Sequence, residues 1–281
     1  MKLVLPVIVL VALQLNVGFS AETFRLSAGA NEVSFPFAER NRRLLVTTPD
    51  NFDPERTYPT LFCFHGAGGR ADGQSSRWSR HANQGDLVVV SAEAVQPLAK
   101  WNFKDNFHTE EHDDVAFVLS VVNKLIEEGV ADKAKLYATG HSSGGLFCYR
   151  LAKETDVFAA FSPMSCGMVK GLHDPGPNAK RVTIMQVIGD QDKSFHGSTN
   201  PRVTMYSARE RIEIWRRFNQ CDQKPMLRNH GEGISVQSYT GPSGNEVAFC
   251  KVEGQGHHLR LDLRDRTDAL ALKFLLKHRR D

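Results

Sequence analysis

The sequence predicts an α/β fold in which a mostly parallel sheet carries helices on both faces. Short, continuous apolar runs alternate along the chain with segments whose apolar residues recur at helical spacing. Such alternation is typical of a parallel sheet built from strand–helix–strand units. Hydrophobic residues make up 41% of the 281 residues and charged residues 24%, so the chain can form a sizeable core.

The expected strands are short apolar runs, and the run at 60–64 stops at a glycine-rich loop, which suits a strand covered on both faces. The strands cover residues 42–46, 60–64, 86–92, 135–139, 158–163, 181–188 and 246–252. Helices are expected from Asp113, where Asp113 or Asp114 can cap the first turn, and over 143–153, 207–218 and 267–277. About eighteen residues separate the strands at 158–163 and 181–188, too few for a large cap domain. We therefore expect an open cleft bordered by small loops.

The first twenty residues have the pattern of a secretory signal peptide. Lys2 precedes an apolar run over 3–13, and small residues at 18–21 fit cleavage after Ser20. The run is shorter than the roughly 20 apolar residues of a membrane span, and no later segment approaches that length. We expect a signal peptide over 1–20, a catalytic domain over 21–281 and a secreted or periplasmic protein. An uncleaved anchor is the alternative.

The net charge and the cysteine content indicate which binding partners, disulfides and metals to expect. A net charge of +3 without a basic cluster does not indicate nucleic-acid binding. An exported chain can form disulfides, and five cysteines leave at least one thiol free in a monomer. We expect Cys63 to be a buried free thiol and Cys221 to pair with Cys250. The chain has no C-x-x-C and no zinc-ligand spacing, so no metal is expected.

A nucleophile motif lies between an expected strand and an expected helix. Residues 140–144 read G-x-S-x-G, with Ser142 at the centre. A sharp strand-to-helix turn at this motif exposes the serine hydroxyl, and the glycines keep neighbouring backbone from colliding with it. The alternative is a glycine-rich turn in which the serine has no catalytic role, and the strand–helix context argues against it.

A serine hydroxyl needs a base, and the base needs an orienting carboxylate. In this fold the order along the chain is Ser, Asp, His. Asp192, after the strand at 181–188, is the expected carboxylate, and Asp190 is the alternative, which could instead stabilise the turn. His257, after the strand at 246–252 and preceded by glycines, is the expected base, with His258 as the alternative.

An oxyanion hole needs two preset backbone N–H groups. One is the amide of Ser143, directly after the nucleophile, and the other should come from the glycine-rich loop at 65–69. We assign Ala67 to this second position, with Gly68 as the alternative. The loop lacks the Lys-Ser/Thr pair and the G-x-G-x-x-G of phosphate-binding loops.

Several motifs occur in an order known from one family. They are His65-Gly66, Trp101-Asn102, residues 113–117, residues 137–140 with the turn at Ser142, residues 189–192, Trp215, Cys221 and residues 252–257. In this order the chain resembles secreted α/β-hydrolases of the polyhydroxybutyrate depolymerase-like and feruloyl esterase-like family, over nearly the whole length after residue 20. The resemblance implies a triad of Ser142, Asp192 and His257, and ester hydrolysis without a metal or cofactor.

The chain departs from the family pattern in three places. Leu259 follows His258 where relatives often have Trp-Pro after the histidine, residues 193–195 lack the proline that often follows the aspartate, and Ser143 replaces a frequent asparagine. These changes leave the chemistry intact and bear on the substrate. Trp101, Asn102 and Phe103 could line the cleft or pack in a loop.

The sequence thus predicts a secreted serine esterase that acts through an acyl-enzyme, with an ester substrate that could be polymeric or derived from the plant cell wall. A peptidase or another acyl-transfer enzyme on the same triad is the first alternative, because one fold hosts many chemistries. A non-catalytic secreted binding module is the second, and the complete triad argues against it.

Overall fold

The structure is a computed structural model that describes residues 24–104, 109, 112–177, 179–200 and 203–280. The expected signal peptide, residues 1–20, lies outside these ranges. No helix in the described ranges combines the length and the apolar composition that a membrane span requires.

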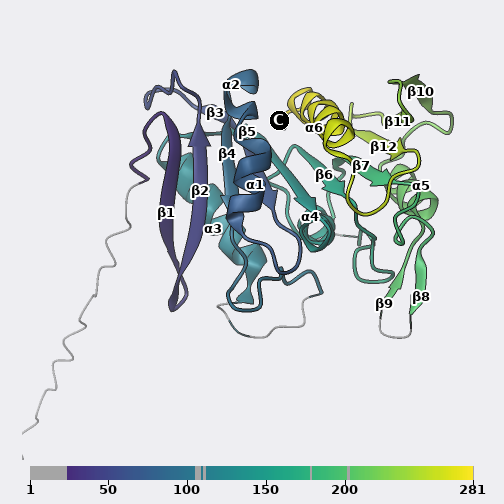
Figure 1. Ribbon diagram of the computed structural model, residues 1–281, viewed down its shortest axis with the longest axis horizontal. Coiled ribbons are helices and arrows are strands. Elements are labelled where there is room, and N and C mark those ends of the chain that lie inside the picture. The colour runs from purple at the N-terminus through teal and green to yellow at the C-terminus, as the bar shows by residue number, and fades with distance from the viewer. Residues whose placement is uncertain (1–23, 105–108, 110–111, 178, 201–202, 281) are drawn as a thin grey trace, which may run out of the picture.

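One large sheet runs through the molecule (Figure 1), in the strand order β1-β2-β4-β3-β5-β6-β7-β12-β11-β10. The central strands from β4 to β12 are parallel, and antiparallel strands extend the sheet at both edges. The strands are β1 Gly29–Phe37, β2 Arg40–Thr48, β3 Tyr58–Phe64, β4 Val88–Ala92, β5 Ala131–His141, β6 Ala160–Met164, β7 Thr183–Gly189, β10 Met226–Asn229, β11 Ile234–Thr240 and β12 Glu246–Val252. A separate hairpin pairs β8 (Ser198–Asn200) with β9 (Val203–Met205).

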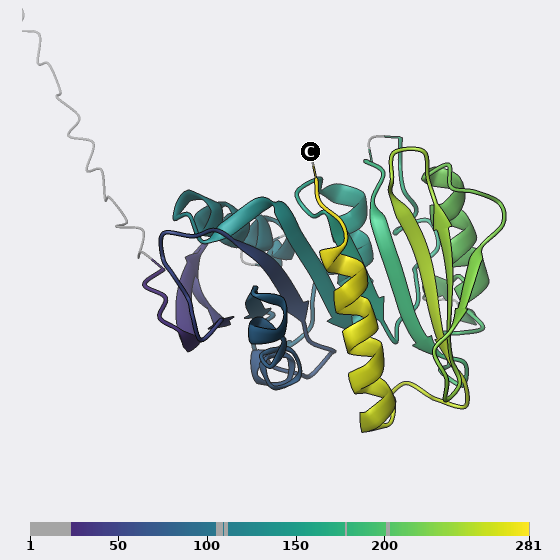
Figure 2. The same ribbon diagram turned by 90° about the horizontal axis from the view of Figure 1, so that it is seen from above.

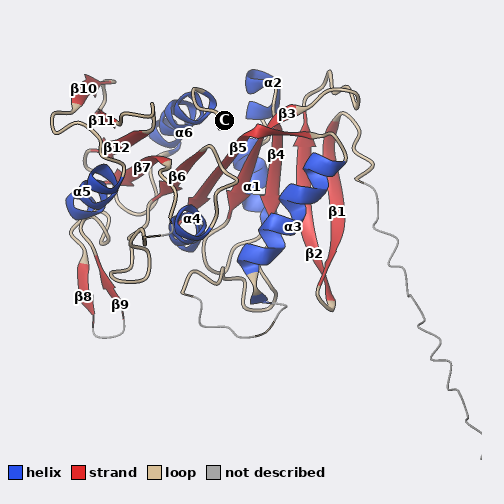
Figure 3. Cartoon of the chain, turned by 180° about the vertical axis from the view of Figure 1, so that it is seen from behind, coloured by secondary structure: helices blue, strands red, loops and turns tan. Residues whose placement is uncertain are grey.

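Helices cover both faces of the sheet. Figure 1 shows α1, α2 and α6 on the near face, and Figure 3, the view from behind, shows α3, α4 and α5 on the other. Seen from above in Figure 2, the sheet lies between these two helical layers. The helices are α1 Ala71–Trp78, α2 His81–Gly85, α3 Asp114–Glu127, α4 Ser143–Glu154, α5 Ala208–Phe218 and α6 Leu261–Leu276. The expected α/β architecture is confirmed.

Each strand expected from an apolar run is present, and the four expected helices are present too. Asp113 caps α3 by accepting a hydrogen bond from the N–H of Ala116, as one of the two expected alternatives. The start of the last helix was wrong: α6 begins at Leu261, and Leu263 is buried in its first turn. The outer strands β1 and β10 could not be predicted from apolar runs. Residues of β1 alternate between half-buried and exposed, and β10 is exposed throughout.

No cap domain interrupts the sheet between β6 and β7. Among its described residues, the segment that connects these strands has no helix. Its one β-bridge joins Val169 to Met205. The carboxyl ends of the central strands are therefore bordered by loops, as expected.

The expected disulfide between Cys221 and Cys250 is wrong. All five cysteines are free and buried, including Cys63, for which this was expected. Successive side chains of β12 point to opposite faces of the sheet, so Cys250 packs in the core beneath α6. Cys221 packs with Phe249 in the core on the α5 side. The sheet lies between the two thiols, which proximity along the chain does not reveal.

Candidate active site

Ser142 occupies the turn that joins β5 to α4. Its backbone has φ 56° and ψ −115°, and non-glycine residues seldom adopt a positive φ. Gly140 and Gly144 make this turn possible. A Cβ on Gly140 would lie 2.4 Å from the Gly144 carbonyl carbon, and one on Gly144 would lie 2.2 Å from the Phe64 carbonyl oxygen. The predicted turn is present, and it packs directly on the end of β3.

Asp192 and His257 meet at the ends of two adjacent strands. Asp192 follows β7 and His257 follows β12, and these strands pair in parallel. The Nδ1 of His257 lies 2.8 Å from Oδ2 of Asp192. The other carboxylate oxygen, Oδ1, accepts hydrogen bonds from the backbone N–H and the hydroxyl of Ser194, each at 2.8 Å. The carboxylate is thus held from both sides while His257 remains accessible.

The charge of Asp192 is stabilised although its side chain is only 2% exposed. Burial by itself raises the pKa of this carboxyl, but the hydrogen bonds from His257 and Ser194 outweigh burial and lower the pKa to about 2. The group is therefore an anion across the neutral range. An anion at this position favours the imidazole tautomer that carries its proton on Nδ1.

The two alternatives, Asp190 and His258, have other contacts. Oδ1 of Asp190 accepts a hydrogen bond from the N–H of Gly254 at 2.8 Å, which ties the β7 loop to the β12 loop. The ring of His258 stacks on His141 at a centroid distance of 5.2 Å. Asp190 thus has the turn-stabilising contact that the sequence left open for it.

One pocket brings the three expected residues together. Ser142, Asp192 and His257 line a pocket of about 350 Å³, which we call the catalytic pocket. Its remaining wall comes from Leu146, from the loops after β6 and β7, and from the β8–β9 hairpin, with residues Ser165, Cys166, Gly167, Lys193, Ser194, Ser198 and Met205. A pocket of this size can enclose part of a small organic ligand.

The β3 loop lies on the other side of Ser142. A Cβ on Gly66 would lie 3.4 Å from the Cβ of Ser142, so this loop and the turn are in contact. The N–H of Gly68 donates to the carbonyl of Ala99 at 2.8 Å and is occupied. In the described part of the chain, no carbonyl accepts from the N–H of Ala67. Ser143 is the first residue of α4, where helix geometry leaves amides without intrahelical acceptors.

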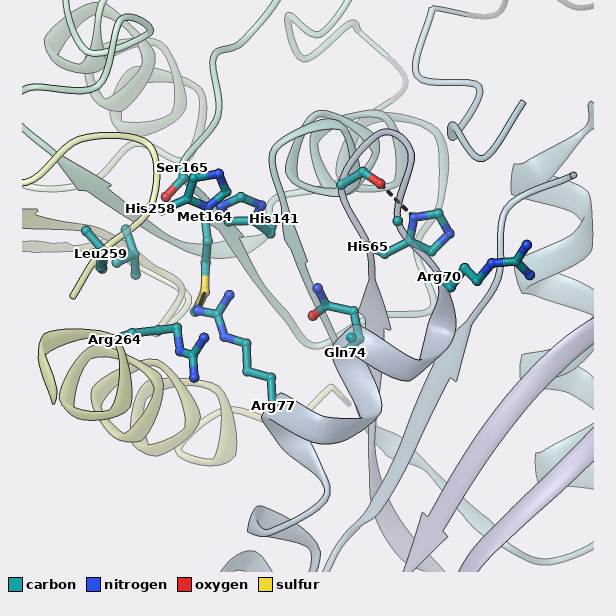
Figure 4. A pocket seen from close by; sticks show the side chains of 14 residues that line it. His65, Arg70, Gln74, Arg77, His141, Met164, Ser165, His258, Leu259 and Arg264 are labelled. Atoms are coloured by element: carbon teal, nitrogen blue, oxygen red, sulfur yellow. Dashed lines mark hydrogen bonds between the residues drawn. The ribbon is translucent and has the colours of Figure 1, made fainter. Parts of the chain in front are cut away.

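His65 holds the β3 loop in place. Its Nδ1 lies 2.8 Å from the carbonyl oxygen of Gly66, drawn as a dashed line in Figure 4, and its Nε2 accepts from the N–H of Ala94 at 3.0 Å. Because the amide can only donate, Nε2 must be unprotonated and the ring must be neutral. Burial lowers the pKa of His65, in agreement with this tautomer. The indole N–H of Trp101 adds a third contact, to the His65 carbonyl oxygen at 3.1 Å.

No family model matches the chain, whereas individual esterases do. The chain is 25% identical over 230 residues to a feruloyl esterase B of Piromyces equi, covering 77% of this chain and 42% of that protein. It is 27% identical over 241 residues to a feruloyl esterase C of Emericella nidulans, covering 83% and 80%. An acetyl xylan esterase structure from Aspergillus awamori superposes with a TM-score of 0.62 at 14% identity, covering 88% of this chain and all (100%) of that one.

The chain has the α/β-hydrolase fold and is similar in sequence to esterases. A poly(3-hydroxybutyrate) depolymerase from Bordetella parapertussis shares the fold, with a TM-score of 0.54 and 20% identity over 69% of this chain and 79% of that one. The chain spans less than half of the Piromyces equi protein, 42%, and most of the Emericella nidulans protein, 80%. The expected resemblance to esterases is confirmed.

Arg211 is a residue of the site that the sequence did not predict. It is fully buried on α5, and its Nη1 donates to the carbonyl of Ser194 at 2.9 Å, beside the Asp192 carboxylate. Its Nε donates to Gln186 at 3.1 Å, and Gln186 donates in turn to the carbonyl of Cys166 at 3.1 Å. This chain of bonds links two loops that line the catalytic pocket. The available signal was a charged residue on the apolar face of α5.

The aromatic segment after β4 packs inside the hydrolase and does not line the catalytic pocket. Trp101 is buried and stacks on Phe147 of α4 at a centroid distance of 5.0 Å. Asp114 accepts from the N–H of Asn102 at 2.7 Å and forms a buried ion pair with Arg42 at 2.8 Å. Of the two uses that the sequence allowed for these aromatics, packing is the one that the structure has.

In the described part of the hydrolase, no group of three or more His, Cys, Asp or Glu side chains is arranged to hold a metal ion.

Proposed function

We propose that this hydrolase is a secreted serine carboxylic ester hydrolase that uses Ser142, Asp192 and His257 as its catalytic triad. The observation that supports the triad most is the 2.8 Å contact between His257 Nδ1 and Asp192 Oδ2, in the pocket that Ser142 also lines. With Nδ1 turned to the carboxylate, the opposite nitrogen Nε2 is the one that can accept a proton from the serine.

In the first step, His257 takes the proton of Ser142 as its hydroxyl attacks the ester carbonyl. Asp192 keeps the imidazole in the required tautomer and stabilises its positive form. The alcohol leaves with a proton from His257. A water molecule, activated by the same histidine, then attacks the acyl-enzyme and releases the acid.

The negative charge of the tetrahedral intermediate falls between α4 and the β3 loop in this proposal. The amides of Ser143 and Ala67 serve as the oxyanion hole. Two observations support this choice: Ser143 begins α4, and the N–H of Gly68, the alternative to Ala67, is occupied by Ala99. Backbone donors fixed before the reaction stabilise the transition state without reorganisation.

We propose bulky esters as the substrate class, including esters of plant-wall or polymer origin. The loops around the catalytic pocket leave it uncovered by a cap, and the pocket wall includes the apolar side chains of Leu146 and Met205. The names of the relatives, feruloyl and acetyl xylan esterases, point to the same class. Secretion through a signal peptide at residues 1–20 fits a substrate outside the cell.

The test is hydrolysis of an ester panel by the purified chain that begins at residue 21. The panel contains 4-nitrophenyl esters of increasing acyl length, methyl ferulate and hydroxybutyrate oligomers, with a matched anilide of each acyl group. We expect ester turnover that Ser142→Ala abolishes, at least 10³-fold, without a change in the thermal unfolding midpoint. Turnover of the anilides alone would replace the esterase by a peptidase, and ester turnover retained in Ser142→Ala would refute the triad.

A further inference from the structure

A second pocket lies next to the catalytic pocket and is not used by the triad. It has a volume of about 370 Å³ and lies between α1 and α6, so we call it the α1–α6 pocket. Figure 4 shows Gln74 and Arg77 reaching into it from α1 and Arg264 from α6, with His141 and His258 above them. The side chain of Arg70 points away from it.

The wall of the α1–α6 pocket carries cations and no anions. None of its 14 lining residues is acidic, and three are arginines. The charge of Arg77 is neutralised, because its Nε donates to the buried carboxylate of Asp268 at 2.7 Å. Arg264 is neutralised less completely. Its Nε forms an ion pair with Asp265 Oδ1 at 3.8 Å, beyond hydrogen-bond reach, and the same oxygen accepts from Arg80 at 2.7 Å.

Two polar atoms in this wall are buried without a hydrogen-bond partner among the described residues. One is Nε of Arg264, and the other is the side-chain oxygen of Gln74, a residue that is only 7% exposed. Burying such groups without a partner costs free energy. Guanidinium groups only donate, whereas the side-chain amide of Gln74 has an N–H₂ donor beside its unpaired oxygen. The wall therefore offers positive charge and donors to a ligand, together with one unpaired acceptor on Gln74.

The α1–α6 pocket is close enough to the nucleophile to receive part of the same substrate. Ser165 lines both pockets. Gly66 also lines the α1–α6 pocket, and a Cβ on it would lie 3.4 Å from the Cβ of Ser142. A group held between α1 and α6 is therefore next to an ester held at Ser142.

We propose that the α1–α6 pocket binds a carboxylate that the ester substrate carries, with Arg264 and Gln74 as its principal donors. This inference rests on the proposed esterase function and narrows it to anionic esters. A carboxylate fits because a planar guanidinium donates to it in a charge-assisted hydrogen bond. Arg77, paired with Asp268, and the neutral imidazole of His141 complete the wall without adding an anion.

Paired substrates that differ by one charge test the proposal. On the leaving-group side, 4-acetoxybenzoate is compared with its methyl ester. On the acyl side, mono-4-nitrophenyl glutarate is compared with 4-nitrophenyl methyl glutarate. We expect the anionic member of one pair to be preferred in kcat/KM after correction for intrinsic reactivity, and the preferred pair tells which half of the substrate enters the pocket.

The variants are Arg264→Gln, Gln74→Glu, which adds a negative charge of the same shape, and the control Arg228→Gln. Arg228 is exposed on β10, at the far edge of the sheet. We expect the ratio of kcat/KM for the anionic ester to that for its neutral partner to fall about tenfold in Arg264→Gln and in Gln74→Glu. The ratio should stay the same in Arg228→Gln.

Binding of free glutarate, measured by its shift of the thermal unfolding midpoint, is independent of turnover. A shift that Arg264→Gln removes and Arg228→Gln retains would support the pocket even if no ester were hydrolysed, which would refute only the esterase proposal. Hydrolysis of neutral esters with no preference for either anionic partner, or a preference unchanged in both pocket variants, would refute the carboxylate site and leave the esterase proposal standing.

Discussion

The two sides of Ser142 are built in different ways. On the β7–β12 side, side chains meet: Asp192 contacts His257, and Arg211 supports their loop from α5. On the β3 side, the backbone of the glycine-rich loop lies against Ser142, and His65 holds this loop through two ring nitrogens. The β7–β12 side is built from particular side chains, whereas the β3 side is built from the backbone of a loop that other residues hold in position.

This difference explains how mutations should act on each side. A side chain that does chemistry is removed by one substitution, whereas a backbone amide survives most substitutions and is lost only through proline or through movement of the loop. The following experiments compare the two sides, each with a matched control residue.

The largest contrast is expected between the two aspartates of the β7 loop. Asp192→Asn replaces the anion that orients His257, so kcat should fall on the order of 10³–10⁴-fold. Asp190→Asn changes a residue whose carboxylate accepts from Gly254 and Gln191 and not from His257, so kcat should fall less than about tenfold. Steady-state kinetics on a neutral 4-nitrophenyl ester measure both. Equal losses would show that the two carboxylates share the role.

On the backbone side, Ala67→Pro deletes one proposed oxyanion donor without changing a functional side chain. We expect kcat to fall about 10²–10³-fold, the usual loss for one such donor, and Ala67→Ser to keep most of it. Circular dichroism and thermal unfolding serve as controls for the fold. If Ala67→Pro remained folded and fully active, another group would have to hold the oxyanion.

His65→Ala should loosen the loop that carries Ala67, and His173→Ala is its matched control. Both imidazoles are buried and bonded twice to backbone, His173 to the N–H of Val169 and to the carbonyl of Phe103. Each substitution leaves buried backbone groups unpaired and should lower stability by about 1–3 kcal/mol. Only His65→Ala should also lower kcat, by about tenfold. An equal effect of both on kcat would mean that His65 acts through general stability.

The smallest effect is a loss of stability in acid. Burial lowers the pKa of His173 to about 4, and burial also lowers the pKa of His65. Because the unfolded chain binds these protons near pH 6.5, stability is full above that pH and falls as the pH drops toward 4. His173 alone should contribute a loss of about 2 kcal/mol between pH 7 and pH 5. Urea unfolding of the native chain and of His173→Ala measures it, and a variant with an unchanged pH slope would contradict the assignment.

The same contrast shows what the sequence could predict. Ser142, Asp192 and His257 could be placed because each follows a recognisable apolar strand, and parallel strands bring their carboxyl ends to one edge. Arg211 could not be placed, because its role comes from the carbonyls and the amide that surround it in the folded chain. The pairing of Cys221 with Cys250 failed for a related reason: the two sides of a sheet are not visible in chain distance.

The β3 loop could be predicted from the sequence only in part. The glycines at 66, 68 and 69 identified it as a backbone site, but the choice between Ala67 and Gly68 depends on the hydrogen bond from Gly68 to Ala99. Ala99 is distant in sequence, and no local pattern marks it as an acceptor. Similarly, the α1–α6 pocket joins Gln74 and Arg264, which only the packing of α1 and α6 on one face brings together.

The most direct test of the central claim is to locate the residue that a fluorophosphonate modifies. The probe reacts with an activated serine, and the catalytic pocket offers Ser142 together with Ser165, Ser194 and Ser198 as candidates of similar location. After labelling and digestion, tandem mass spectrometry should find the adduct on Ser142, in the peptide between Lys135 and Arg150, and Asp192→Asn should suppress it. An adduct on another serine of the pocket, or none on the folded protein, would contradict the assignment of Ser142 as the nucleophile.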